Sequence, residues 1–377
     1  MNQFADSGGC RGWINRAGDS LILQVRRCRD HALLICALLL IPQAGSAGDS
    51  VSSDKLITRI ALGSCADQKK PQPIWESITA LSPELFLFLG DNVYADTDDM
   101  EKLRACYAKL GAVPGYRRLL DICPVIAVWD DHDYGVNDGG AEFAMKAGSE
   151  EVFHEFFKPP SDSPSLHRPG IYDARTFDGG KGRRLQILLL DTRYFRSPLV
   201  AFPAKTASGP YDRNRDSSAT VLGVDQWAWL KEELKKPADL RILLSSFQFL
   251  PQDHHWESWE NFPLERQRML DLLSASGTGP VIFLSGDRHM GEIMKLATTD
   301  PQSPGFPIYE MTTSGLTHAG GGGVGEPNRH RISPTNFQRL NFGMIEIDWN
   351  TYRVTLELRN VEGKVVDDYV ADMRAAQ

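Results

Sequence analysis

Short apolar runs recur along the chain and predict strands that are covered on both faces. Each run is rich in Leu, Ile or Val and lacks the apolar–polar alternation of a strand with one solvated face. The runs are Ile57–Leu62, Leu85–Leu89, Val125–Val128, Leu185–Leu190, Ile242–Leu244 and Val281–Leu284. Strands of this kind are typical of sheets that carry helices on their faces.

Helical patterns separate several of these runs. Apolar residues recur at helical spacing in the segments 74–81, 100–120, 224–236 and 263–276. Within 224–236, Trp227, Leu230 and Leu234 fall on one face, and Pro237 ends the pattern. Strands that alternate with helices predict an α/β fold.

The C-terminal part of the chain follows a different pattern. Apolar and polar residues alternate more strictly in the segments 342–349, 352–360 and 364–373, which predicts an antiparallel meander. Three stretches without a clear pattern, 158–182, 196–222 and 318–336, are expected to be long loops. The last contains four consecutive Gly residues but no Gly-Lys-Ser/Thr, so we expect a flap beside a site rather than a phosphate-binding P-loop.

The N-terminal residues look like a secretion signal. Three Arg residues within 26–29 precede the apolar run Ala32–Ile41, and Gly45–Ala47 offers a small-residue cleavage site. The apolar run is too short to span a bilayer, and a buried helix is the alternative interpretation. We therefore expect a leader over 1–47 and a single domain over 48–377. The protein would be secreted or periplasmic, without a transmembrane anchor once the leader is removed.

The charge and the cysteine content indicate which partners are excluded and how the thiols are used. The formal net charge of −8 argues against nonspecific nucleic-acid binding, whose affinity comes mainly from Lys and Arg on phosphates. Outside the leader the chain keeps Cys65, Cys106 and Cys123. An odd number of Cys residues in an exported protein leaves one thiol for another role. Cys106 and Cys123 are close enough in sequence to pair, which would leave Cys65 unpaired.

Polar side chains follow nearly every buried run. In chain order they are Cys65, then Asp91 and Tyr94, the cluster Asp130–Asp133, then Asp191 and Arg193, Ser245 and Ser246, and finally Asp287 and His289. Ligands of open α/β sheets bind at the carboxyl ends of the strands. We therefore expect these groups to meet in one crevice.

The cluster Asp130–Asp133 indicates a metal site. Its three carboxylates repel one another unless cations neutralise them or water surrounds them. A solvated surface turn is the alternative, but the apolar residues before the cluster place it at the mouth of a buried strand. Carboxylates suit hard cations, and a thiolate beside a phenolate, as Cys65 and Tyr94 would supply, suits Fe(III). Asp91 is the natural bridge, because two cations about 3.5–4 Å apart can share a carboxylate and clamp a phosphoryl group.

The ordered set of motifs resembles the PhoD-like phosphatases, the alkaline phosphatase D family of the metallophosphatase superfamily. The matching pieces lie between about residues 57 and 318 and are GSCAD, LGDNVYAD, WDDHDYGVND, LLLDTRYFR, LGVDQWAWL, SSFQF, IFLSGDRHMGE and TTSGLTH. The resemblance implies a four-layer α-β-β-α sandwich. It also implies hydrolysis of small phosphate monoesters or diesters by a metal-bound hydroxide. The implied cofactors are Fe(III) and Ca(II), with other divalent metals open.

The resemblance implies roles for single residues as well. The family's metal ligands match Cys65, Asp91, Tyr94, Asp287 and His289. Where metallophosphatases generally place Asn and then His, this chain has Asp131 and His132. We therefore expect Asp131 and the nearby Asn137 to be ligands, and His132 to be the acid that protonates the leaving group.

Basic residues near the strand ends are candidates for substrate binding. The guanidinium of Arg193 could bond two phosphoryl oxygens, although a salt bridge with Asp191 or another carboxylate would explain it equally well. Arg288 is the rival clamp. His254 and His255 could line the substrate entrance, although histidines on loops are often merely exposed.

Two other functions stay open at this point. One is a phosphodiesterase or phospholipase that acts on lipid head groups. The other is a secreted metal-binding protein without catalysis, which would not need an acid such as His132 beside its ligands.

Overall fold

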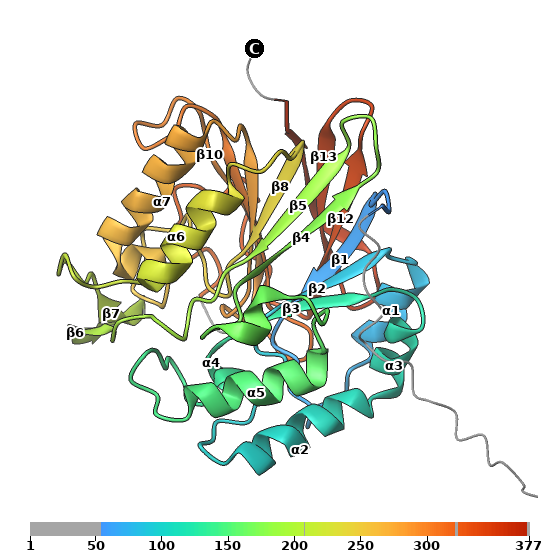
Figure 1. Ribbon diagram of the computed structural model, residues 1–377, viewed down its shortest axis with the longest axis vertical. Coiled ribbons are helices and arrows are strands. Elements are labelled where there is room, and N and C mark those ends of the chain that lie inside the picture. Colours follow the sequence, from blue (N-terminus) through green and yellow to red (C-terminus); the bar gives the residue numbers. More distant parts are fainter. Residues whose placement is uncertain (1–53, 207, 321–322, 375–377) are drawn as a thin grey trace, which may run out of the picture. The chain divides into compact units, whose positions relative to one another are not determined.

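Two six-stranded sheets face each other at the centre of the fold (Figure 1). The computed structural model describes residues 54–206, 208–320 and 323–374, which belong to one compact unit. The predicted leader lies outside the described residues. Within the described residues, we find no helix whose length and apolar character would let it cross a bilayer.

The first sheet joins the beginning and the end of the described chain. Its strand order is β14-β13-β12-β1-β2-β3. β1, β2 and β3 run parallel, whereas β12, β13 and β14 form the antiparallel meander predicted from the sequence. The strands are β1 (Arg59–Gly63), β2 (Leu85–Leu89), β3 (Val125–Val128), β12 (Asn341–Asp348), β13 (Arg353–Asn360) and β14 (Val365–Asp372).

The second sheet has the order β10-β11-β9-β8-β5-β4. Its four central strands are parallel and its two edge strands are antiparallel to their neighbours. The strands are β4 (Asp173–Asp178), β5 (Arg184–Leu189), β8 (Leu240–Leu244), β9 (Val281–Ser285), β10 (Gly291–Leu296) and β11 (Ile308–Thr313). A separate hairpin is formed by β6 (Val200–Thr206) and β7 (Gly209–Asp212).

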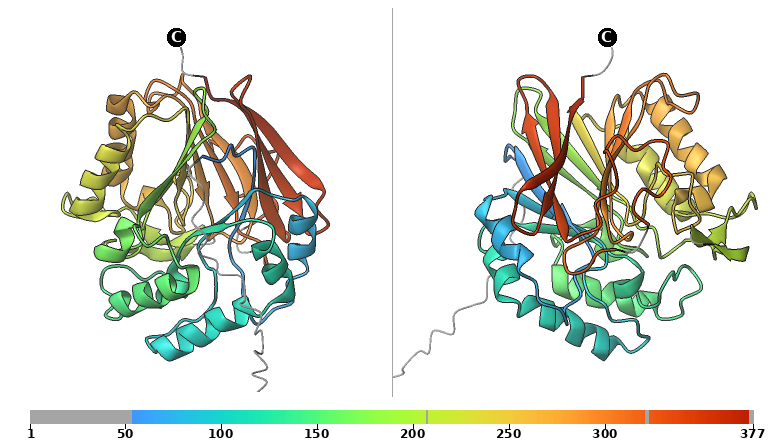
Figure 2. Two further views of the ribbon diagram at one scale, coloured as in Figure 1. Left: turned by 45° about the vertical axis from the view of Figure 1, so that its right-hand side comes forward. Right: turned by 180° about the vertical axis from the view of Figure 1, so that it is seen from behind.

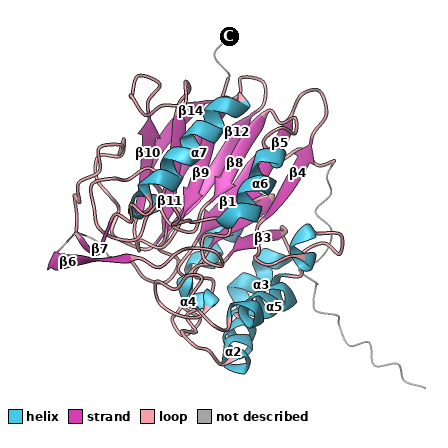
Figure 3. Cartoon of the chain, turned by 60° about the vertical axis from the view of Figure 1, so that its left-hand side comes forward, coloured by secondary structure: helices cyan, strands magenta, loops and turns pink. Residues whose placement is uncertain are grey.

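Helices on the outer sides of the sheets complete a four-layer α-β-β-α sandwich, as predicted. α6 (Gly223–Glu233) and α7 (Pro263–Ser276) lie along the second sheet (Figure 3). The helices on the side of the first sheet are α1 (Ile74–Ala80), α2 (Met100–Gly111), α3 (Pro114–Leu120) and α5 (Lys146–Phe157) (Figure 2). Short turns add α4 (Asp131–Tyr134), η1 (Pro164–His167) and η2 (Trp259–Asn261). The pattern over 100–120 splits into α2 and α3, because Pro114 occupies the first turn of α3 and cannot continue a preceding helix.

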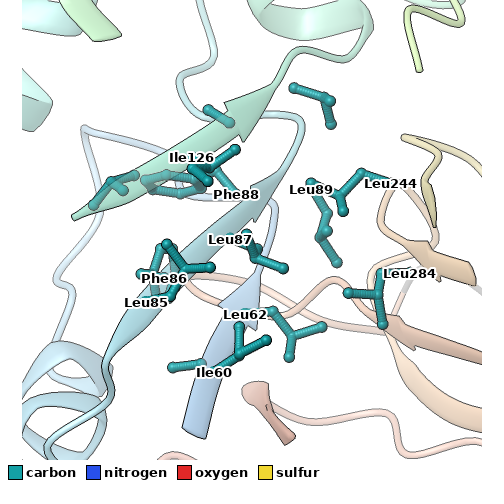
Figure 4. Close-up of a cluster of buried hydrophobic side chains, with 14 of the residues drawn as sticks. Ile60, Leu62, Leu85, Phe86, Leu87, Phe88, Leu89, Ile126, Leu244 and Leu284 are labelled. Atoms are coloured by element: carbon teal, nitrogen blue, oxygen red, sulfur yellow. The ribbon is translucent and has the colours of Figure 1, made fainter. Parts of the chain in front are cut away.

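The apolar runs are continuous because the two faces of each strand pack into two different hydrophobic clusters. In β8, Leu240, Ile242 and Leu244 join the cluster between the sheets, whereas Leu243 joins the cluster under α6 and α7. Successive side chains of a strand point to opposite faces, so a strand buried on both faces is apolar at nearly every position. In β8 the exception is Arg241, which donates to Gln186. Figure 4 shows the inner cluster, where Leu244 and Leu284 of the second sheet lie near Leu89 of the first.

Some elements lie where the sequence predicted loops, and one bond that the sequence left open does not form. The stretch 158–182 contains η1 and β4, and 196–222 contains β6 and β7. α5, β10 and β11 were also not predicted from the sequence. Cys106 and Cys123 are buried free thiols, so the disulfide that their spacing allowed does not form in the structure.

Candidate metal centre and active site

Loops at the carboxyl ends of strands from both sheets meet at one site. Cys65 follows β1, Asp91 and Tyr94 follow β2, and His289 follows β9. Cys65 Sγ lies 3.3 Å from Asp91 Oδ2, and the Tyr94 hydroxyl lies 3.0 Å from the same oxygen. The hydroxyl is also 3.1 Å from His289 Nε2. The structure thus brings together a thiol, a carboxylate, a phenol and an imidazole that the sequence separates by up to about two hundred residues.

The backbone at these positions is unusual for non-glycine residues. The φ angles are 63° at Cys65, 50° at Asp91, 66° at Asp287 and 52° at His289, all in the left-handed region. Such a conformation costs of order 1–3 kcal/mol per residue and is typical of functional sites. Each residue lies two to four residues beyond the end of a strand, where the chain turns sharply and aims the side chain at the site.

Two groups of potential metal ligands share the Asp91 carboxylate. Cys65, Asp91 and His289 place ligand atoms within 4.8 Å of one another, and so do Asp91, Asp131 and His132. A carboxylate common to two such groups is the arrangement that a bridged pair of cations needs. The geometry therefore fits two metal positions on either side of Asp91.

The acidic groups of the site are buried close together, which disfavours their charged forms unless a cation is bound. Burial, followed by repulsion from Asp131, raises the pKa of Asp91 well above its usual value. Burial and the charge of Asp91 likewise raise the pKa values of Cys65 and Tyr94. Burial and the charges of Asp130 and Asp131 raise the pKa of Asp287. A bound cation reverses this balance and favours the deprotonated ligands, so the donor set fits a metal centre.

The surroundings of His132 favour its protonated form. Burial alone would lower its pKa, but the hydrogen bond to Asp96, at 2.6 Å, and the charges of Asp91 and Asp131 raise the pKa to about 10. By contrast, burial and the nearby positive charge of His132 lower the pKa of His289 to about 4. The two imidazoles therefore differ in charge near neutral pH, which suits an acid in one case and a neutral ligand in the other.

A pocket of about 170 Å³ opens beside these groups. Its lining includes the predicted residues Asp131, His132, Asn137, Asp287, Arg288 and His289, together with Asp138, Pro210, Tyr211, Trp256 and Glu257. Asn137 is exposed at this pocket, and its amide donates to Asp138 Oδ2 at 2.7 Å. The pocket thus combines candidate ligands, a guanidinium and aromatic surface.

Arg193 does not reach this pocket. Its side chain is fully buried, with Nε donating to Asp130 Oδ1 at 2.5 Å and Nη1 donating to Glu257 Oε1 at 2.9 Å. Of the two interpretations open at the sequence level, the salt bridge describes its place, although the partners are Asp130 and Glu257 rather than Asp191. The phosphate clamp predicted for Arg193 does not fit this position, because carboxylates already occupy its donors.

The two histidines expected at the entrance contact other groups of the protein. His254 is buried, and its Nε2 lies 3.2 Å from Gln248 Oε1. His255 Nδ1 contacts the carbonyl of Tyr211 at 2.8 Å and its ring packs on Phe202. Neither His254 nor His255 is among the residues that line the pocket, so the structure gives both a supporting position instead of the predicted contact with substrate.

Sequence reasoning missed His318, which follows β11. Its Nε2 lies 3.0 Å from His289 Nε2, and its ring is 4.9 Å from that of Tyr94. The hydroxyl of Thr317 bonds both the Cys65 carbonyl and His318 Nδ1. The motif TTSGLTH contains this residue at the end of a strand, which was the available signal. The strand before it was not predicted, because Glu310 interrupts its apolar pattern.

Comparison with known proteins identifies the family. Residues 60–358 match the family model described as PhoD-like phosphatase, which is well over half of the chain. The chain belongs to the PhoD-like phosphatase family.

Individual relatives of this PhoD-like chain are distant. Alkaline phosphatase D of Bacillus subtilis (strain 168) is 23% identical over 185 residues, which cover 44% of this chain and 31% of the relative. The match therefore spans about a third of that relative's length. A solved structure of PhoD is 16% identical with a TM-score of 0.63, covering 84% of this chain and 68% of that chain. A structure described as GAP50, the anchor in the inner membrane complex of Plasmodium, is 12% identical with a TM-score of 0.53, covering 86% and 90%. These two likenesses show the shared fold.

Proposed function

We propose that this protein is a metal-dependent phosphoesterase that hydrolyses small phosphate monoesters or diesters. The observation that carries the proposal is the pair of ligand groups that share Asp91 beside a pocket lined by Arg288. Membership of the PhoD-like phosphatase family supports the same reaction class. The leader-like segment before residue 48 supports export, so we place the enzyme outside the cell or in the periplasm.

Each candidate ligand has a place in this proposal. Cys65, Tyr94 and His289 would hold one cation, Asp131 and Asn137 would hold the second, and Asp91 would bridge them. Asp287 lines the same pocket and would complete the set. Thiolate and phenolate donors favour Fe(III) at the first position, and oxygen donors favour Ca(II) or another divalent cation at the second. When bound, such cations polarise the phosphoryl group and activate water.

Residues of the chain supply the remaining parts of the reaction. Arg288 lines the pocket and would bind a phosphoryl oxygen with its guanidinium. His132 would protonate the oxygen of the leaving group, because Asp96 and the surrounding carboxylates keep the imidazole charged. Pro210, Tyr211 and Trp256 would contact the organic part of the ester.

The proposal is tested by measuring metals and activity on the same protein. Metal analysis of the purified protein should find bound cations, and the protein should hydrolyse p-nitrophenyl phosphate, bis-p-nitrophenyl phosphate or both. A Tyr94→Phe variant should shift the visible absorption that phenolate-bound Fe(III) produces. A metal-free protein that hydrolyses these esters at full rate would contradict the proposal.

Replacing the shared carboxylate gives a sharper test. Asp91→Asn should lower kcat by at least about a thousandfold, because both cations lose a ligand. The fold should persist, since Asn removes a buried charge that its acidic neighbours repel. Asp239→Asn, just before β8 at the opposite end of the second sheet, is the matched control and should keep full activity. Near-normal activity of Asp91→Asn would exclude the bridged centre.

A further inference from the structure

Arg288 is the pocket-lining residue with a permanent positive charge. It lies between Asp287 and His289, and its guanidinium is 5.3 Å from the ring of Trp256. The side chain is 3% exposed, so water does little to screen its charge. The partner of Arg288 therefore affects how strongly this pocket attracts an anion.

A carboxylate from the Gly-rich segment pairs with Arg288. Nη2 of Arg288 donates to Glu326 Oε2 at 2.9 Å, and the Glu326 side chain is 6% exposed. Of the described residues, Glu326 is the carboxylate within ion-pair distance of Arg288. A buried pair of this kind interacts much more strongly than an exposed one.

His254, which also lies next to Arg288, does not accept a hydrogen bond from the guanidinium. Gln248 donates through Nε2 to Glu292 and Thr312, so its Oε1 accepts from His254. The backbone N–H of Trp256 donates to His254 Nδ1, which leaves the ring proton on Nε2. Nη1 of Arg288, 3.1 Å from that nitrogen, therefore faces another donor and finds no acceptor there.

Glu326 is held in position by its own segment. The N–H of Glu326 donates to the carbonyl of Gly323, and the N–H of Gly325 donates to Asn336 Oδ1. The amide of Asn336, a buried side chain, donates back to Gly323. The Glu326 carboxylate is therefore a fixed part of the site.

We propose that Glu326 is a specificity-determining residue that makes the pocket prefer phosphate esters with a single negative charge. The inference rests on the proposed function and deepens it. Because Glu326 offsets the charge of Arg288, the site offers the second negative charge of a monoester one positive charge fewer, whereas a diester carries a single charge and loses less from this pairing.

The test compares two esters that differ in charge and little in size. p-Nitrophenyl phosphate and its methyl diester have the same leaving group, so the ratio of their kcat/KM values reports on charge. In Glu326→Gln, which keeps the shape and an oxygen for Arg288, we expect this ratio to move at least about tenfold toward the monoester. Inhibition by inorganic phosphate, a dianion at alkaline pH, should strengthen by a similar factor.

Controls separate this inference from the proposed function. Glu362→Gln removes an exposed carboxylate in the turn between β13 and β14 and should leave the ratio unchanged. Glu326→Ala serves as a second variant should Glu326→Gln fail to fold, and it should move the ratio in the same direction. If the wild-type protein hydrolyses the esters but neither variant moves the ratio, the role of Glu326 is wrong and the phosphoesterase stands. A wild-type protein that hydrolyses neither ester overturns both.

Discussion

Arg193 and Arg288 carry the same guanidinium but lie in different surroundings. Asp130 and Glu257 close around Arg193 in the protein interior, where its side chain is inaccessible. Arg288 lines the pocket and keeps a donor that faces no acceptor. At the scale of single residues, the position of the carboxylates decides which arginine can bind a phosphate.

Arg288 is therefore expected to contribute directly to substrate binding. Arg288→Ala should lower kcat/KM for both p-nitrophenyl esters about 10- to 150-fold, because a hydrogen bond to a charged group contributes about 1.5–3 kcal/mol. Steady-state kinetics measure the effect. Arg329→Ala is the matched control, since Arg329 is exposed and paired with Asp253. Equal losses in both variants would contradict a specific contact.

Asp96 is expected to set the alkaline limit of activity. Its hydrogen bond helps to raise the pKa of His132 to about 10, so the protonated acid persists below that pH and is lost as the pH rises through it. Asp96→Asn should lower this limit by roughly one to three pH units. The profile of kcat/KM against pH for phenyl phosphate, whose leaving group depends on a proton, measures the shift. An unchanged alkaline limb would show that His132 is not the acid.

At the scale of elements, one buried ionic cluster ties several loops together. Asp130 follows β3, Arg193 follows β5, and Glu257 precedes η2. Ser246, after β8, also donates to Asp130 at 2.6 Å. Because Asp131 and His132 come directly after Asp130, the cluster positions the end of β3 that carries them.

Breaking this cluster should lower stability more than a surface pair would. Arg193→Met leaves two carboxylates buried with less compensation and should lower the free energy of unfolding by about 3–5 kcal/mol. Arg184→Met breaks a partly exposed pair with Asp239 and should lower it by about 0–1 kcal/mol. Urea unfolding measures both. A similar small loss in the two variants would show that the cluster contributes little.

The strands that were not predicted, such as β11, depend on contacts with residues that are distant in sequence. β11 contains Glu310, a buried carboxylate that accepts hydrogen bonds from the backbone of Phe249 and Leu250 and from Ser285. These partners lie 25 to 61 residues away in sequence, so no window around β11 can reveal that a charge is tolerated there. Strand β2 and the apolar runs of β1 and β8, which pack against generic apolar side chains, were predictable from their own residues.

At the scale of the whole molecule, some residues of the candidate site could likewise be predicted from the sequence and others could not. Residues at the ends of predicted strands, such as Asp91 and His289, could be placed together because ligands of α/β sheets bind at the carboxyl ends of the strands. Arg193 and His254 could not, because the groups that bury them belong to other loops. His318 sits in a motif visible in the sequence, but its contact with His289 depends on β11, which the pattern missed.

The proposed centre takes ligands from both sheets, so cations should stabilise the whole fold. Cys65, Asp91 and Tyr94 come from the first sheet and Asp287 and His289 from the second. Removing the metals with a chelator should lower the melting temperature by several degrees, since a ligand at a hundred times its Kd adds about 2.7 kcal/mol. Calorimetry before and after chelation measures this. The same treatment should leave Asp91→Asn unchanged; an equal shift there would point to a different metal site.

The left-handed backbone at Cys65, Asp91, Asp287 and His289 also bears on how such a protein can be improved. Glycine adopts that conformation without strain, so a library screened for heat resistance with the metals removed by a chelator would favour glycine at these positions. Every such gain would discard a ligand and leave a sturdier but inert protein. A thermostable form therefore has to be selected for turnover and heat resistance together.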